Sequence, residues 1–286
     1  MVSFCLAAAV VASGLSPSLS PSRGGGTAFT IVHLSDVHIR MRFDAPARLR
    51  LALRAVRRLA PELVINSGDT LDGPRDTIAG TLDFEAKWSA WNEAVSRELR
   101  GLPLLNALGN HDLDEPLSLA DSCRRLGMPG PYYARDHRGW RFLVLNSNGF
   151  ERDTRQWDWL VSQLRTTPAA TPIAIVSHHP IFSMGALVDG GGELIGRWRD
   201  LVALFAKHRN VKLCLSGHTH LADLCRYNGV TYACGGSVSG YWWEIEKSSD
   251  GKGSYLQTPP GFHVIRLSAS GVVDVEYRRY EDPATR

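Results

Sequence analysis

The chain has 286 residues, of which 44% are hydrophobic and 21% are charged, and its formal net charge at pH 7 is +3. That length is enough to bury a large core, in one large domain or in two small ones. The mild positive charge is far from the strongly basic surface that binding to nucleic acid requires, so we expect no nucleic-acid partner.

Residues 1–27 differ in composition from the rest of the chain. An apolar run over residues 2–12 leads into Ser13, where small residues form a plausible cleavage site, and a stretch rich in Ser, Pro and Gly follows. The run is similar to a secretory signal peptide, although no Lys or Arg precedes it, and it is too short to span a bilayer stably. We therefore expect a signal-like or disordered leader at 1–27 and a single domain at 28–286. An exported, periplasmic location is slightly favoured over a cytoplasmic one.

From residue 29 onward, one pattern repeats along the chain: an apolar strand, a polar loop and often a helix. The expected strands are FTIVHLS (29–35), ELVINSG (62–68), LPLLNALG (102–109), TPIAIVS (171–177) and VKLCLSG (211–217). The expected helices cover residues 45–59, 85–99, 154–164 and 198–207. Because the apolar runs are mostly continuous rather than alternating, they indicate strands buried on both faces.

Three later segments predict antiparallel hairpins, with turns at Arg138-Gly139, Asn228-Gly229 and Ser270-Gly271. Strands that alternate with helices, together with added hairpins, predict an α/β architecture with mixed sheets. The chain shows no convincing boundary to a second domain.

Arginines are concentrated in residues 40–58. After Pro46 they alternate with apolar residues at helical spacing, which predicts an amphipathic helix with a solvated face. Arg40 and Arg42 precede that helix and follow a polar motif directly, so a contact with an anionic substrate is the alternative interpretation for these two.

The five cysteines include no CxxC pair, which excludes zinc-ribbon and thioredoxin-like motifs. Cys225 and Cys234 flank the expected turn at Asn228-Gly229. Counting back from that turn places Cys225 opposite Tyr232 rather than opposite Cys234, so buried free thiols are favoured over a disulfide.

Five of the strand-end loops carry side chains that can bind metal. These are Asp36 and His38, Asp69, Asn110 with His111 and Asp112, His178 with His179, and His218 with His220. Loops at the carboxyl ends of strands in α/β sheets face one crevice, so these segments can converge. Carboxylate, imidazole and amide ligands without thiolate suit Mn, Fe, Zn or Co. One such loop alone is typical of a cap or turn, whereas five in succession predict a metal site.

The order of these motifs resembles the calcineurin-like metallophosphoesterase superfamily. The matching stretches, between about residue 29 and residue 220, are DVH, GDTLD, GNHD, HHP and GHTH. The resemblance implies a four-layer α/β/β/α sandwich of two mixed β-sheets flanked by helices. It also implies a dinuclear-metal-dependent phosphoester hydrolase, in which a metal-activated water attacks phosphorus in line.

The resemblance further implies roles for individual residues. The ligands of one metal would be Asp36, His38, Asp69 and His220. Those of the second would be Asp69, Asn110, His178 and His218, with Asp69 bridging two divalent or trivalent ions (Mn, Fe, Zn or Co). His111 would contact the phosphoryl group or help proton transfer, while Asp72 and Asp112 would orient imidazoles. His179 is not expected to be a ligand, because the family's ligand lies two residues before the proline.

Comparison with the branches of the superfamily narrows the expected reaction. Purple acid phosphatases carry Tyr at the position of Asp72 and Gly at that of His38, and protein phosphatases carry Arg where Gly73 stands. Repair nucleases carry DNA-capping segments, whose electrostatic footprint a chain of net charge +3 lacks. The remaining match is the compact cyclic-nucleotide and glycerophosphodiester phosphodiesterase branch, which acts on small-molecule phosphoesters.

Two alternatives to a phosphodiesterase stay open. One is a phosphomonoesterase or pyrophosphohydrolase acting on a nucleotide or lipid head group, because only the shape of the pocket distinguishes it. The other is a non-catalytic scaffold of the same fold, which is disfavoured because all seven ligand positions are filled. Tyr241, Trp242 and Trp243 could stack on a base or sugar or could pack in the core, and residues 189–196 could form a lid or an ordinary surface loop.

Overall fold

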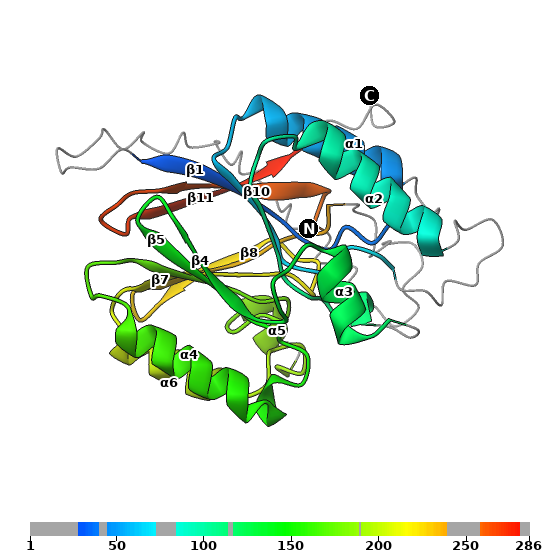
Figure 1. Cartoon of the computed structure of the whole chain (residues 1–286). Helices are drawn as coiled ribbons and strands as arrows, with labels where there is room; N and C mark the ends of the chain where they lie inside the picture. The colour runs from blue at the N-terminus through cyan, green and yellow to red at the C-terminus, as the bar shows by residue number, and fades with distance from the viewer. Residues whose placement is uncertain are drawn as a thin grey trace, which may run out of the picture.

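Two β-sheets are stacked face to face, and helices cover the outer face of each (Figure 1). The computed structural model describes residues 28–39, 45–72, 84–113, 117–188, 190–238 and 258–280. The leader at 1–27, Arg40, Arg42, Gly73, Asp189 and the aromatic residues 241–243 lie outside these ranges. Within them the predicted α/β sandwich of two mixed sheets flanked by helices is confirmed.

The first sheet has five strands in the order β11-β10-β1-β2-β3. Their bounds are Phe29–Leu34 for β1, Leu63–Asn66 for β2, Leu104–Asn106 for β3, Gly261–Leu267 for β10 and Val273–Arg279 for β11. Strands β1, β2 and β3 are parallel, so their carboxyl ends lie at one edge, whereas β10 runs antiparallel to both of its neighbours. The sheet is therefore mixed, as the sequence predicted.

The second sheet has six strands in the order β4-β5-β6-β7-β9-β8. Their bounds are Tyr133–His137 for β4, Trp140–Val144 for β5, Ile173–Val176 for β6, Val211–Ser216 for β7, Asp223–Tyr227 for β8 and Val230–Cys234 for β9. Strands β5, β6, β7 and β9 are parallel, and the outer strands β4 and β8 run antiparallel to their neighbours.

The predicted hairpin turns are confirmed. Arg138 and Gly139 have φ of 50° and 81°, and Asn228 and Gly229 have φ of 51° and 80°. Two successive positive φ values are those of a type I′ turn, whose twist matches that of the strands it joins. In the second hairpin Cys225 lies opposite Tyr232, and both Cys225 and Cys234 are free thiols.

Helices α1 (Ala45–Arg58) and α2 (Phe84–Glu98) cover the first sheet, and α4 (Thr154–Thr166) and α6 (Trp198–Lys207) cover the second (Figure 1). Each differs from its predicted bounds by two residues at most. Two shorter helices, α3 (Leu119–Arg125) and α5 (Met184–Val188), were not predicted. They are too short for an apolar period, and α5 depends on a distant partner, because Asp223 accepts a hydrogen bond from the amide of Gly185 at 3.1 Å. None of the helices in the described ranges is long and apolar enough to cross a membrane.

Two buried histidines lie in the apolar core between the two sheets. His33 on β1 and His263 on β10 are almost fully buried, with 3.4 Å between their Nδ1 atoms, and His33 Nε2 lies 2.9 Å from Ser67 Oγ. Burial lowers the pKa of His263 to about 4. Burial, and after it electrostatic repulsion from His263, also lowers the pKa of His33. Both imidazoles are therefore neutral in the folded protein at neutral pH.

This pair predicts a loss of stability in mild acid. The pKa of His263 is depressed in the folded state, so its contribution is fully present above the unfolded value of about 6.5 and is lost as pH falls toward 4. We expect the wild type to lose about 2–3 kcal/mol more of its free energy of unfolding than His263→Asn between pH 7 and pH 4.5. Urea unfolding in the presence of a chelator measures this difference. His208→Asn, at the end of α6, serves as the control, and equal pH dependence of wild type and His263→Asn would contradict the prediction.

Candidate metal centre

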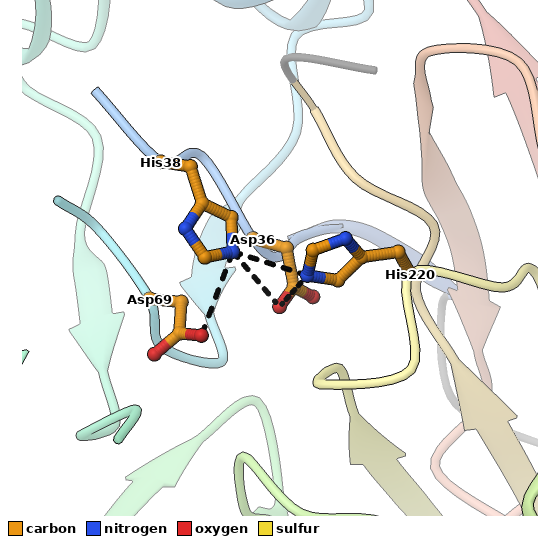
Figure 2. Close-up of side chains that lie close together, drawn as sticks. All are labelled: Asp36, His38, Asp69 and His220. Atoms are coloured by element: carbon orange, nitrogen blue, oxygen red, sulfur yellow. Dashed lines mark hydrogen bonds and ion pairs between the residues drawn. The ribbon is translucent and has the colours of Figure 1, made fainter. Parts of the chain in front are cut away.

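The loops that follow β1, β2, β3, β6 and β7 meet at the carboxyl ends of these parallel strands. The first group of side chains comprises Asp36, His38, Asp69 and His220, whose ligand atoms all lie within 4.8 Å of one another (Figure 2). The Nε2 atoms of His38 and His220 are 3.1 Å apart, and Asp36 Oδ1 lies 3.3 Å from His220 Nε2. All four side chains are at most 5% exposed. These are the four residues predicted for the first metal.

A second group shares Asp69 with the first. Its members are Asp69, His178 and His218, again with ligand atoms within 4.8 Å of one another. Asn110 lies beside this second group, because its Oδ1 is 3.1 Å from His178 Nε2. These are the residues predicted for the second metal.

The two oxygens of Asp69 face different partners. Oδ1 accepts a hydrogen bond from the backbone N–H of His111 at 2.9 Å. Oδ2 lies 3.5 Å from His38 Nε2 and 3.2 Å from His178 Nε2. A single oxygen of Asp69 is therefore directed at both groups.

The backbone of these loops has an uncommon conformation. Positive φ, between 44° and 72°, occurs at five of the clustered residues: Asp36, His38, Asp69, His218 and His220. Such values are rare for residues other than glycine and cost free energy, so the surrounding structure has to maintain them. Bonds between the loops do so in part, because Gly68 O accepts from the amide of Asp36 and Asp69 O accepts from that of His38. Backbone strain concentrated in this way is a common property of functional sites.

Two glycines of the motifs allow the loops to approach closely. A Cβ atom at Gly109 would lie 2.0 Å from Asp69 Oδ1, and one at Gly217 would lie 1.8 Å from Ser35 Oγ. Neither position can accept a side chain unless the loop carrying Asp69 or Asp36 moves. The glycines of GNHD and GHTH are therefore required by the packing around the acidic side chains.

Charge and burial act against each other on the titratable groups. Burial would raise the pKa of Asp36 and Asp69, but the neighbouring histidines outweigh it and hold both pKa values below the usual range. Burial would likewise lower the pKa of His38 and His178, but the carboxylates raise these values to about 10 and about 9. The site is thus built to keep buried carboxylates ionised beside positive charge.

The remaining predicted residues surround the two groups. Asp72 Oδ1 lies 3.3 Å from His38 Nδ1, on the side of the ring away from the first group. The ligand atoms of His38, Asp72 and His111 lie within 4.8 Å of one another. The rings of His111 and His38 are 5.0 Å apart. His179 directs its Nδ1 at Ser147 Oγ, 2.8 Å away, and its ring lies 4.1 Å from that of His218.

Asp112 bonds to the backbone rather than to an imidazole. Its two carboxylate oxygens accept hydrogen bonds from the amides of Thr70, at 3.0 Å, and Gly109, at 2.9 Å. Burial and the charge of Asp69 raise its pKa to about 6. Asp112 therefore joins the loop after β2 to the loop after β3.

Substitution of Asp112 by alanine should destabilise the protein. It leaves two buried amides without an acceptor, each costing about 1–3 kcal/mol, so we expect the free energy of unfolding to fall by about 2–5 kcal/mol. Urea denaturation measures the change. Asp200→Ala removes an exposed ion pair with Arg197 and should cost about 1 kcal/mol or less. Equal stability of the two variants would show that Asp112 does not hold these loops together.

Sequence reasoning missed three residues at the site. Ser147 and Asn148 follow β5, where Ser147 Oγ accepts from the amide of His179 and Asn148 Nδ2 donates to Gly109 O. Their polar strand-end loop repeats the pattern of the other five and could have been recognised. The third is Glu193, whose Oε2 lies 2.7 Å from His218 Nε2. No pattern in the sequence marks Glu193.

The donor atoms fit a metal ion. Imidazole nitrogens and carboxylate oxygens, with an amide oxygen and without thiolate, converge from five loops in a buried place, and this donor set suits borderline-to-hard cations. The Nε2 atoms of His38 and His220 lie only 3.1 Å apart, beside two ionised carboxylates. A cation placed there would accept the lone pairs of both nitrogens and would neutralise the carboxylate charge. The fold and this cluster together define a metal-dependent phosphatase architecture.

The chain belongs to the calcineurin-like phosphoesterase family, whose model matches residues 29–222. It is also 30% identical, over 216 residues, to a probable cyclic nucleotide phosphodiesterase of Synechococcus sp., a match that covers 70% of this chain and 76% of the relative. The predicted superfamily is thereby confirmed, and a metallophosphoesterase with a candidate metal site is what the fold and family support.

Two solved structures share the fold at low sequence identity. The purple acid phosphatase PPD1 of yellow lupin superposes with a TM-score of 0.64 at 16% identity, covering 91% of this chain and 53% of that one, so this chain spans about half of its length. A dimetal phosphatase of Danio rerio superposes with a TM-score of 0.60 at 15% identity, covering 88% and 99%. At 15–16% sequence identity, these two structures show that the fold is shared.

Proposed function

We propose that the protein is a dinuclear-metal-dependent phosphodiesterase acting on a small-molecule phosphoester. The observation that carries the proposal is the position of Asp69 Oδ2, within 3.5 Å of a ligand nitrogen in each of the two groups. One carboxylate oxygen placed between two sets of ligands is the arrangement that two neighbouring cations need, because a shared negative charge offsets their repulsion.

The first ion would be held by Asp36, His38, Asp69 and His220, and the second by Asp69, Asn110, His178 and His218. When bound, the two ions would supply an activated water and would stabilise the attacking and leaving oxygens of an in-line displacement. Mn, Fe, Zn and Co all suit these ligands.

The residues around the ligands hold them in place. Both carboxylate oxygens of Asp36 accept the amide of His218 at 3.1 Å, which fixes the plane of that carboxylate. His178 is oriented by its Nδ1, which lies 3.1 Å from Ser67 O. Asp72 orients His38 in the same manner. Such outer contacts fix the ring that presents the ligand nitrogen.

His111 is the proposed acid–base or phosphate-contacting residue. Its backbone amide is bonded to Asp69, so its position follows that of the shared ligand, and its side chain is only partly buried. A side chain that acts on the substrate needs both an anchored backbone and an accessible ring. His111 would donate a hydrogen bond to a phosphoryl oxygen or a proton to the leaving oxygen.

Preference for a phosphodiester is supported by the relative from Synechococcus and by the motifs, which lack the Tyr and Gly of the purple acid phosphatases at Asp72 and His38. A phosphomonoesterase is the competing proposal. Turnover of bis-p-nitrophenyl phosphate against mono-p-nitrophenyl phosphate, with Mn²⁺ supplied, separates the two. Faster diester turnover supports the proposal, and the reverse order contradicts it. A panel of cyclic nucleotides and glycerophosphodiesters then identifies the substrate class.

A further inference from the structure

A line of polar side chains connects the buried histidine pair to the first group of ligands. Ser35 Oγ donates a hydrogen bond to Asp36 Oδ2 at 2.5 Å, and Ser67 Oγ donates to Ser35 Oγ at 2.8 Å. His33 Nε2 lies 2.9 Å from Ser67 Oγ, and His263 Nδ1 lies 3.4 Å from His33 Nδ1. The four residues His263, His33, Ser67 and Ser35 are called the relay here, and each is at most 2% exposed.

The backbone holds the relay in place. The amide of Ser67 donates to Leu34 O at 3.0 Å, which joins the ends of β1 and β2. A Cβ atom at Gly235 would lie 3.1 Å from Ser35 Cβ and 3.2 Å from His33 Cε1, so the loop after β9 packs closely against the relay. The two hydroxyls therefore have few positions to choose from.

The charge of Asp36 sets the direction of donation along the relay. An ionised carboxylate can only accept, so the proton of Ser35 points at Asp36 and Ser35 Oγ accepts from Ser67. Since Ser67 has given its only proton to Ser35, its oxygen accepts from Nε2–H of His33. Nδ1 of the neutral His33 ring then carries no proton and accepts from Nδ1–H of His263. The direction thus fixes the tautomers of both core histidines.

The relay occupies one oxygen of Asp36 and leaves the other for the ligand group. Oδ2 receives the hydroxyl of Ser35, whereas Oδ1 lies 3.3 Å from His220 Nε2 and 3.8 Å from His38 Nε2 (Figure 2). The backbone of Asp36 is strained, with a φ of 52°, so its orientation depends on contacts made by its surroundings. The relay supplies one of these contacts from inside the core.

We propose that the relay positions Asp36 by holding its Oδ2, so that Oδ1 faces the first group of ligands. The four relay residues touch neither ion nor substrate and act only through Asp36. The inference rests on the proposed function, because it requires an ion at the first group. It gives His33 and His263 a part in metal binding, although both lie in the core between the sheets.

Nitrogen-15 NMR of the chelator-treated full chain at neutral pH tests the direction of the relay without metal, because protonated and bare ring nitrogens differ in chemical shift. In the wild type we expect the proton of His33 on Nε2 and that of His263 on Nδ1. Ser35→Ala cuts the connection to Asp36, so the hydroxyl of Ser67 can turn to His33 and both rings should become mixtures of tautomers. Thr167→Val removes a buried hydroxyl at the end of α4 and should keep the wild-type tautomers.

Calorimetric titration with Mn²⁺ tests the consequence for metal binding in the wild type, Ser67→Ala and Thr167→Val. Ser67→Ala interrupts the relay but keeps the carbonyl oxygen of residue 67, which lies 3.1 Å from His178 Nδ1. The second group of ligands therefore retains its contact. We expect one of two equivalents to be bound about 10- to 100-fold less tightly in Ser67→Ala alone, the usual effect of losing a residue that orients a ligand.

The two measurements fail in different ways. A proton on Nδ1 of His33 in the wild type, or unchanged tautomers in Ser35→Ala, overturns the direction of the relay and with it the proposal. Expected tautomers with unchanged Mn²⁺ binding in Ser67→Ala, or an equal loss in Thr167→Val, overturn the role of the relay and leave the dinuclear centre intact. A wild type that binds no Mn²⁺ contradicts the proposed function, and the role of the relay as well, whichever tautomers are found.

Discussion

Replacing Asp69 by asparagine is expected to abolish tight binding of both metal ions and to lower kcat/KM by at least about 10³-fold, since loss of a residue that merely orients a ligand already costs about 10- to 100-fold. Asparagine has the same shape and can still accept the hydrogen bond from the amide of His111. It lacks the negative charge, however, that Oδ2 presents to His38 and His178. The effect should therefore extend to both groups of ligands at once.

Metal content after dialysis, measured together with turnover, checks this expectation. Asp136→Asn, which removes an exposed carboxylate paired with Arg141, is the control and should retain both ions and full activity. If Asp69→Asn lost one equivalent and kept the other at wild-type affinity, Asp69 would be a ligand of one ion and the shared centre would be wrong.

Replacing His111 by alanine is expected to leave both metal ions in place and to lower kcat by about 10²–10⁴-fold, the usual range for a general acid–base group. The anchor of this residue is its backbone amide, which alanine retains, so Asp69 keeps its hydrogen bond. Only the ring that reaches the substrate is lost.

Metal stoichiometry and single-turnover rates separate this outcome from a structural effect. His208→Ala, at the end of α6 and remote from the ligands, should behave as wild type. Loss of metal from His111→Ala would instead show that His111 is a metal ligand. Its closeness to His38 and Asp72 would then reflect a shared role in binding the ion.

Electrostatic attraction between carboxylates and histidines outweighs the cost of burying them, which explains how the site can hold several buried charged groups. Asp36 and Asp69 are almost fully buried, yet their pKa values lie below the usual range because histidines surround them. An isolated carboxylate in such a place would take up a proton instead. The charges of the cluster therefore stabilise one another, and removal of any one should weaken the rest.

Much of the fold and site could be predicted from local pattern. Continuous apolar runs predicted the strands that precede the ligand loops, and helical spacing predicted α1, α2, α4 and α6. The glycines at Arg138-Gly139 and Asn228-Gly229 predicted the two hairpin turns with positive φ. The loops that carry the candidate ligands also came from the sequence, because each polar loop follows a strand and such loops share one edge of a sheet. The choice of seven ligands among their side chains came from the resemblance to the calcineurin-like superfamily. These features depend on residues within a few positions of one another.

Other features depended on contacts between distant segments. No local pattern indicated that Asp112 joins two loops through their amides rather than orienting an imidazole. The position of Asp69 between the two groups was expected only from the family resemblance, and the distances from its Oδ2 to His38 and His178 come from the tertiary structure. Helices α3 and α5 and the approach of Glu193 to His218 were equally absent from any local pattern. The order of the strands and the packing of one sheet on the other decide which loops meet, and no period in a single segment encodes that arrangement.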